Sequence, residues 1–307
     1  MNDLERLSEL FNMGKITRRQ FVNKLSLLGI AAAAAPLMKA GYVFAATPKK
    51  GGRLRAGLTG GSTTDSLDPG LVVSNMNQFI NMQVRNCLVE IDENYEAVPE
   101  LAASWEPSPD AVQWTFELRK GVEFHNGKTM TAEDVVYSIN HHRKQDTKSA
   151  AKGIAEPITD IKADGKNTVV FTLKEGNADF PYIASDYHIS IVPKGTKGKE
   201  YEKGVGTGPF ALQAWEPGVR FFGKRNANYF KSGRPYFDEV EILGIEDLSA
   251  RTNSLKTGQI HVMNRCDPKT FNLLERMPDV QALKLEGARH YTIPMLTTIK
   301  PYDNNDV

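Results

Sequence analysis

The sequence predicts an α/β fold combined with a hairpin-rich α+β subdomain. Residues 239–274 alternate strand-like and helix-like stretches, which is the rhythm of an α/β sheet. Two earlier stretches, 112–125 and 161–173, show period-two alternation of apolar residues beside turn residues, which is typical of hairpins. The chain has 307 residues, 40% of them hydrophobic, which is enough material for a large core in more than one domain.

The first expected strand contains Leu54, Ala56 and Leu58, which alternate with charged or small neighbours. It leads into the loop 59–65, which is too rich in glycine and hydroxyl groups to continue a helix or a strand. The loop lacks the helix entry and the lysine of a P-loop, so phosphate binding has weak support. Ser74 is then expected to cap a helix whose apolar stripe consists of Met76, Phe79, Ile80 and Val84.

The stretch 98–142 predicts a hairpin followed by a capped helix. Its strands are expected at Val112 to Leu118 and at Val122 to His125, and Asn126-Gly127 then turns the chain. Thr131 and Asp134 have the spacing of a capping box, which predicts that a helix begins here. The unit is interpreted as a folding unit without catalytic residues.

A second hairpin is expected from Ile161 to Leu173, with its turn at 164–167. Further along, two glycines flank Thr207, and such glycines permit close approach of a neighbouring backbone. Phe210 then begins a strand. A cleft wall and a tightly packed turn are equally good interpretations of Thr207.

The last third of the chain predicts a strand that ends next to two polar residues. A helix over 248–257 is stopped by Gly258, a strand follows over 259–263, and Asp267-Pro268 begins another helix. Ligands of α/β sheets gather at the carboxyl ends of strands, where Asn264 and Arg265 lie. Both are therefore candidate ligand contacts, and the donor fork of Arg265 suits a carboxylate. A salt bridge to a neighbouring acid is the alternative.

The first 45 residues predict a leader that is removed on export. Thr17 to Val22 resembles a twin-arginine export motif, and the apolar run 25–37 is too short and alanine-rich to span a membrane. Cleavage is expected after Ala45, which would release a soluble protein. The alternative is an amphipathic helix with an alanine-rich anchor.

Several function classes find no support in the sequence. A formal net charge of +1 gives no electrostatic footprint for nucleic acid. The patterns GxxxxGK[ST], HExxH, CxxC and GxSxG are all absent, so no enzyme, cofactor or metal site is expected. His141 and His142 are adjacent on a helix and cannot share a face as a metal pair. The sequence is compatible with either a disulfide between Cys87 and Cys266 or two free thiols. A buried free thiol is expected for Cys87.

The stretch 98–139, VPELAASWEPSPDAVQWTFELRKGVEFHNGKTMTAEDVVYSI, resembles a signature of extracytoplasmic solute-binding proteins of peptide and nickel ABC importers. Matches to this dipeptide- and oligopeptide-binding family continue in the same order over most of residues 50–265. They include 66–69 (SLDP), 87–91 (CLVEI), 206–210 (GTGPF), Arg225-Asn226 with Tyr229, and 258–260 (GQI).

The resemblance implies a periplasmic-binding-protein-like lobe with a mixed sheet over residues 46–300. A subdomain is inserted at about 80–190, and residues 301–307 begin the crossover to a second lobe that is largely absent. The resemblance also implies that the loop containing Ser62, Thr63 and Thr64 borders the ligand cleft, with a plain surface turn as the alternative.

The resemblance further implies a monomeric periplasmic component that captures short peptides and delivers them to an inner-membrane ABC permease, after export by the twin-arginine machinery. Other possible ligands are a nickel chelate, an oligosaccharide or another non-peptide solute, and a secreted chaperone-like protein is a more distant alternative. If the protein ends at Val307, two lobes cannot close on a ligand, and binding is expected to be weak or absent.

Overall fold

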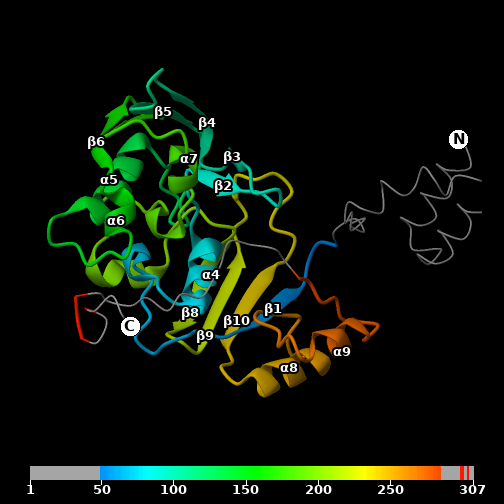
Figure 1. Ribbon diagram of the computed structural model, residues 1–307. Helices are drawn as coiled ribbons and strands as arrows, with labels where there is room; N and C mark the ends of the chain where they lie inside the picture. The colour runs from blue at the N-terminus through cyan, green and yellow to red at the C-terminus, as the bar shows by residue number, and fades with distance from the viewer. Residues whose placement is uncertain (1–48, 285–297, 301–302, 304–307) are drawn as a thin grey trace, which may run out of the picture. The chain divides into compact units, whose positions relative to one another are not determined.

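The computed structural model describes residues 49–284, 298–300 and 303. The expected leader over 1–45 and most of the expected crossover over 301–307 lie outside these residues. The chain forms two compact units, one up to Asn264 and a smaller one from Arg265. Nearly all described elements belong to the larger unit (Figure 1), and the smaller one contains the helix α9 (Phe271–Glu275).

A five-stranded mixed sheet is the foundation of the larger unit (Figure 1). The strand order is β11-β1-β10-β9-β8, in which β1 runs parallel to β10 and β11, and β9 runs antiparallel to both its neighbours. The bounds are β1 (Arg53–Leu58), β8 (Phe210–Glu216), β9 (Arg220–Arg225), β10 (Glu239–Gly244) and β11 (Val262–Met263). The mixed sheet expected from the family resemblance is confirmed.

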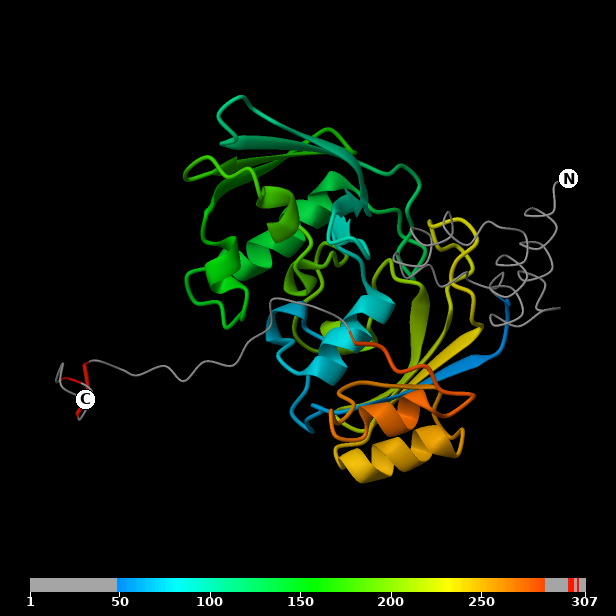
Figure 2. The same ribbon diagram turned by 45° about the vertical axis from the view of Figure 1, so that its right-hand side comes forward.

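Helices cover both faces of this sheet (Figure 2). The helix α4 (Asn75–Val84) buries Met76, Ile80 and Val84 in one core cluster with Ala56 and other strand residues. Gly57, the next residue of β1, faces the opposite side, where a Cβ would meet Ile260 and Arg251 near α8 (Leu248–Lys256). The alternation of side chains along β1 therefore serves two helix layers at once.

A second core lies under a four-stranded antiparallel sheet, ordered β4-β5-β7-β6. The helix α5 (Ala132–Arg143) packs against β6 and β7. The strands are β4 (Ala102–Pro107), β5 (Gln113–Leu118), β6 (Ile158–Asp164) and β7 (Thr168–Leu173). Its buried residues run from Leu88 to Ile191, and the expected subdomain at about 80–190 stays a prediction.

Short elements connect these layers. They are a small hairpin of β2 (Val89–Ile91) and β3 (Ala97–Pro99), the helices α6 (Lys152–Ala155) and α7 (Phe180–Ile183), and three 3₁₀ turns, η1 (Pro69–Leu71), η2 (Tyr187–Ile189) and η3 (Gly198–Lys203). In the described ranges no helix has the length and apolar character needed to cross a membrane.

The expected hairpin over 112–125 is wrong in its pairing. The strand β5 pairs with β4 and β7, while residues 122–125 contribute only an isolated bridge from Glu123 to Thr129 around the Asn126-Gly127 turn. The alternation itself is confirmed, since Trp114, Phe116 and Leu118 are buried. Alternation shows which face of a strand is buried, but it does not identify the neighbouring strand. The strands β4 and β7 form longer pairings with β5 than the four residues 122–125 could form.

Most other local predictions are confirmed. The second hairpin forms as β6 and β7, and Ser74 caps α4. The Thr131 amide donates to the Asp134 carboxylate at 2.9 Å, as the capping box requires, and the Thr131 hydroxyl donates to the same carboxylate at 3.0 Å. Phe79 differs from expectation because its side chain is 36% exposed.

Two boundaries in the last third of the chain are also shifted. The strand expected over 259–263 is reduced to the two residues of β11, because Gln259 and Ile260 donate their amides to Ser254 in the turn that closes α8. The helix expected at Asp267-Pro268 begins at Phe271.

Candidate functional site

The carboxyl ends of three parallel strands meet at one edge of the five-stranded sheet. The strands end at Leu58, Gly244 and Met263, and the loops that follow them contact one another. The Thr59 amide donates to Oδ1 of Asn264 at 3.1 Å. Asn264 therefore follows a strand end, beside the loop after β1, where ligands of α/β sheets gather. Its contact with a ligand stays a prediction.

Glu246 organises this strand-end edge, although the sequence did not single it out. Its carboxylate accepts hydrogen bonds from the Thr59 hydroxyl at 2.5 Å and from the amides of Gly60 and Gly61 at 2.6 and 3.0 Å. The hydrogen bond from Thr59, followed by those from the two amides, holds the pKa of Glu246 below its usual value. Because a protein carboxylate occupies these two amides, they are not available to a phosphate.

The hydroxyl residues of the loop lie at the surface. Ser62, Thr63 and Thr64 are all exposed, and the Ser62 and Thr64 hydroxyl oxygens lie 2.8 Å apart. The Ser62 amide donates to Asp65 at 3.0 Å. Behind the loop, the backbone of Gly218 packs so closely that a Cβ there would lie 2.5 Å from the Ser62 carbonyl carbon. The backbone of the loop is therefore fixed by its contact with Gly218, while Ser62, Thr63 and Thr64 are exposed to solvent.

Arg265 opens the smaller compact unit. Its φ angle of 51° lies in the left-handed region, which is uncommon for residues other than glycine. The side chain is exposed and forms no hydrogen bond or ion pair within the described ranges. The expected carboxylate contact stays a prediction.

Thr207 is fully buried, and its hydroxyl donates to Oδ1 of Asn86 at 3.0 Å. The glycines on either side fit against the end of α4, where a Cβ on Gly206 or Gly208 would collide with the backbone of Val84. The close backbone approach expected from these glycines is confirmed. The packing favours the packed-turn interpretation, and ligand contact by Thr207 stays a prediction.

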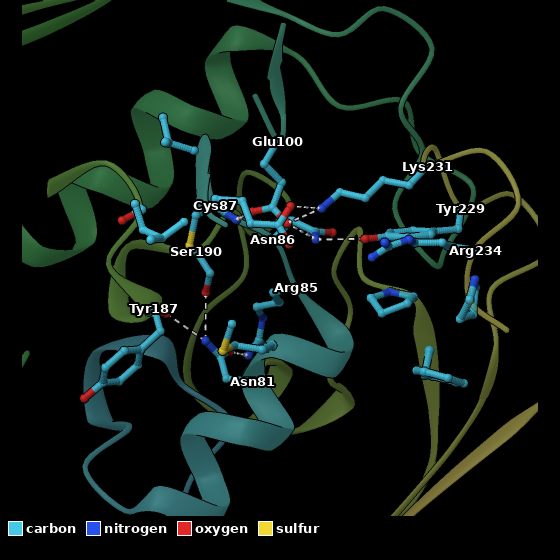
Figure 3. Close-up of a pocket in the computed structure, with 18 of the residues that line it drawn as sticks. Asn81, Arg85, Asn86, Cys87, Glu100, Tyr187, Ser190, Tyr229, Lys231 and Arg234 are labelled. Atoms are coloured by element: carbon cyan, nitrogen blue, oxygen red, sulfur yellow. Dashed lines mark hydrogen bonds and ion pairs between the residues drawn. The ribbon is translucent and has the colours of Figure 1, made fainter. Parts of the chain in front are cut away.

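A pocket of about 470 Å³ lies near the opposite end of β10 (Figure 3). Pro235 to Phe237, just before β10, and Phe210, the first residue of β8, form part of its wall. The residues after α4 and the loop around Tyr187 line another part. The pocket and the strand-end edge are therefore separate places in the larger unit.

An acid–base network occupies one side of the pocket. Glu100 is only 8% exposed and accepts from the Cys87 amide at 2.9 Å, from Asn86 Nδ2 at 2.7 Å and from Lys231 Nζ at 3.1 Å. Lys231 also pairs with Glu90. Burial raises the pKa of Glu100 despite these donors. Burial alone would lower the pKa of Lys231, but the nearby negative charges outweigh it and raise that pKa.

Arg85 lies deeper in the pocket wall and is only 1% exposed. Its guanidinium donates to Asn81 Oδ1 at 2.8 Å and to the Tyr201 carbonyl at 3.3 Å, while its Nε has no hydrogen-bond partner in the described part of the chain. Burial lowers the pKa of Arg85 to about 10. The group remains a cation at neutral pH.

Sequence reasoning missed the pocket and Glu246. A weak signal was present for Glu100, because it is a charged residue in the otherwise apolar stretch 97–103, whereas Arg85 is flanked by the polar residues Gln83 and Asn86. The sequence gives no such signal for Glu246 or Lys231, because each lies in a loop, where an exposed charged residue is common.

The described residues form neither a metal-binding cluster nor a disulfide. Among the residues that the structure describes, no three His, Cys, Asp or Glu side chains are grouped so that they could hold a metal ion. Cys87 and Cys266 are both free, and Cys87 is buried as expected, with its Sγ 3.3 Å from the Asp186 carbonyl.

Comparison with known proteins defines the family. Residues 96–307 match the model of bacterial extracellular solute-binding proteins, family 5 (middle part), and the chain belongs to this family. An oligopeptide-binding protein, AppA of Bacillus subtilis (strain 168), is 30% identical over 257 residues, which cover 77% of this chain and 46% of the relative.

Solved structures agree with this assignment. The periplasmic binding protein DppA from Helicobacter pylori, in complex with the peptide STSA, is 28% identical with a TM-score of 0.68, over 75% of this chain and 50% of that one. AgaA from A. tumefacien R10, in complex with agropinic acid, is 28% identical with a TM-score of 0.69, over 74% of this chain and 46% of that one. The periplasmic-binding-protein fold is confirmed, and the chain spans about half the length of the relatives it matches.

Proposed function

We propose that this protein is the periplasmic solute-binding component of an ABC importer, and that it captures short peptides and delivers them to an inner-membrane permease. In this proposal the twin-arginine machinery exports it, cleavage near Ala45 releases a monomer, and it performs no chemistry. The described residues contribute one lobe and one wall of the binding cleft. The ligand is then buried when a second lobe closes on it and shifts the open–closed equilibrium.

The observation that carries the proposal is the strand-end edge in a chain of this family. Three loops meet there, the hydroxyl groups of Ser62 and Thr64 face outward, and Glu246 and Gly218 hold the loop in place. Exposed hydroxyl groups can pair with the backbone groups of an extended peptide, and water can adapt the site to varied side chains.

A non-peptide solute is the second candidate. AgaA is a structural neighbour in complex with agropinic acid, so the fold alone does not identify a peptide. A nickel chelate or an oligosaccharide belongs to the same alternative, and a secreted chaperone-like protein is more distant.

Native mass spectrometry of the protein purified from the periplasm of its own host tests export and ligand class together. We expect a processed N-terminus near Ala45 and a peptide released on denaturation. Release of a non-peptide organic solute would favour the second candidate. An unprocessed protein in the cytoplasm with no bound solute would contradict both candidates.

Titration with the peptide STSA tests the assignment of the edge. The double variant Ser62→Ala/Thr64→Ala should weaken binding about tenfold, since each lost hydrogen bond is worth about 0.5 to 1.5 kcal/mol. The matched control is Ser104→Ala, which removes an exposed hydroxyl on β4 and should leave the affinity unchanged. Equal affinities for all three proteins would exclude the loop 62–64 from the site.

A further inference from the structure

The pocket in Figure 3 is distinct from the strand-end edge. The edge follows the last residue of β10, whereas the pocket is lined by residues that precede the first residue of β10, Glu239. The lengths of β1 and β10 therefore separate the two places. A volume of about 470 Å³ lies within the range of sites that bind small organic molecules.

The carboxylates around the pocket already have partners. Both oxygens of Glu100 accept hydrogen bonds, Glu90 pairs with Lys231, and Asp186 accepts from the His188 amide and ring at 2.9 and 2.7 Å. Each of these acids therefore already has a hydrogen-bond or ion-pair partner within the protein, although Glu90 and Glu100 share the single cation of Lys231.

The hydrogen-bond donors around the pocket are not all used. Arg85 is fully buried and its Nε is unpartnered in the described chain, although buried polar groups are normally satisfied. The Tyr229 hydroxyl accepts from Asn86 at 3.2 Å, which leaves its own proton for another acceptor. Arg234 is exposed, forms no ion pair within the described ranges, and lies beside Tyr229 in Figure 3. The unmet requirement is for an acceptor.

The rest of the wall is apolar and aromatic. Met82, Val89 and Ile91 line the pocket together with Phe210, Tyr236 and Phe237. Apolar walls with a few convergent polar groups are typical of small-molecule sites, in which the walls provide affinity and the polar groups fix orientation. A guanidinium group recognises carboxylates because its planar fork of N–H donors matches the two oxygens of a carboxylate.

We propose that this pocket is a second ligand site, which binds a small organic acid by an apolar or aromatic body and a single carboxylate. The Arg234 guanidinium, the Tyr229 hydroxyl and Nε of Arg85 are the donors to the two oxygens of this carboxylate. The proposal does not depend on the peptide-binding function.

Ligand-observed NMR and calorimetric titration of the full chain with phenylacetate test the proposal, with phenylacetamide as the uncharged probe of the same shape. We expect phenylacetate to bind at least tenfold more tightly than phenylacetamide. The variant Arg234→Gln should lose at least tenfold in affinity for phenylacetate, and Tyr229→Phe should lose several-fold. Arg276→Gln, which removes an exposed arginine of the smaller unit, is the control and should bind as the unchanged protein does.

Arg234 is exposed, so its replacement should leave the unfolding midpoint unchanged, and a urea titration verifies this. The peptide STSA should not displace phenylacetate, because the strand-end edge is a separate place. Absence of phenylacetate binding, equal binding of the two probes, an unaffected Arg234→Gln variant, or displacement by STSA would each overturn the second site.

Discussion

The two ends of the five-stranded sheet use their polar groups in different ways. At the strand-end edge, Glu246 is an exposed carboxylate that accepts from Thr59 and two backbone amides. At the pocket, Glu100 is a buried carboxylate that is paired with Lys231 and hydrogen-bonded to Asn86. Substitutions at the exposed edge should therefore change ligand binding with little effect on folding, and substitutions at the buried network should change stability first.

The largest effect should come from the packed turn between the pocket and α4. In Gly208→Ala, the added Cβ would collide with the backbone of Gln83 and Val84, which cannot move without shifting the end of α4. We expect the free energy of unfolding to fall by at least about 3 kcal/mol in urea denaturation.

The control for this substitution is Gly153→Ala in α6, where a Cβ would meet no atom within 4 Å. It should be neutral or slightly stabilising, because alanine favours helix formation over glycine. Equal stabilities of the two variants would show that the packing around Gly208 does not matter for folding.

A smaller loss is expected from Lys231→Met, because this change leaves Glu100 buried without its cation. We expect about 2 to 3 kcal/mol of destabilisation, since breaking one partner of a buried pair is costly even when the remaining carboxyl group can take up a proton. Lys174→Met breaks an exposed pair with Glu156, whose atoms are 3.7 Å apart, and should cost less than about 0.5 kcal/mol. Similar losses in both variants would show that the buried Lys231–Glu100 pair contributes no more to folding than an exposed ion pair does.

The smallest effect is a difference in the pH dependence of stability. Burial raises the pKa of Glu100 above 4.5 in the folded state, so its contribution to stability is full below pH 4.5 and is lost as the pH rises through the folded pKa. Hydrogen bonds lower the pKa of Glu246, so its contribution is present above pH 4.5 and is lost as the pH falls through the folded pKa. The two carboxylates therefore contribute slopes of opposite sign.

Urea unfolding at a series of pH values between about 3 and 7 measures these slopes, each of which has a limit of about 1.4 kcal/mol per pH unit. The variant Glu100→Gln should make stability rise more steeply with pH. Glu246→Gln should flatten the acid limb below pH 4.5. Glu93→Gln, an exposed acid between β2 and β3, is the control. Slopes that change in the same direction in Glu100→Gln and Glu246→Gln would contradict the assignment.

Local patterns in the sequence predicted much of the fold. The capping box at Thr131, the N-cap at Ser74 and the β6–β7 hairpin depend on residues a few positions apart, and each is confirmed. The position of Asn264 at a strand end was likewise predictable, because the helix stop at Gly258 and the strand after it are local signals.

The sequence by itself determined which faces are buried, where helices begin and which family the chain resembles, since all three depend on neighbouring residues or on ordered motifs. Only the tertiary structure decided which strands pair, as the partners of β5 show. It also decided that Glu246 reaches Gly60, 186 positions earlier, and that Lys231 reaches Glu100, 131 positions earlier. Contacts at such separations depend on how the whole chain packs, and a single sequence carries no periodicity that specifies them.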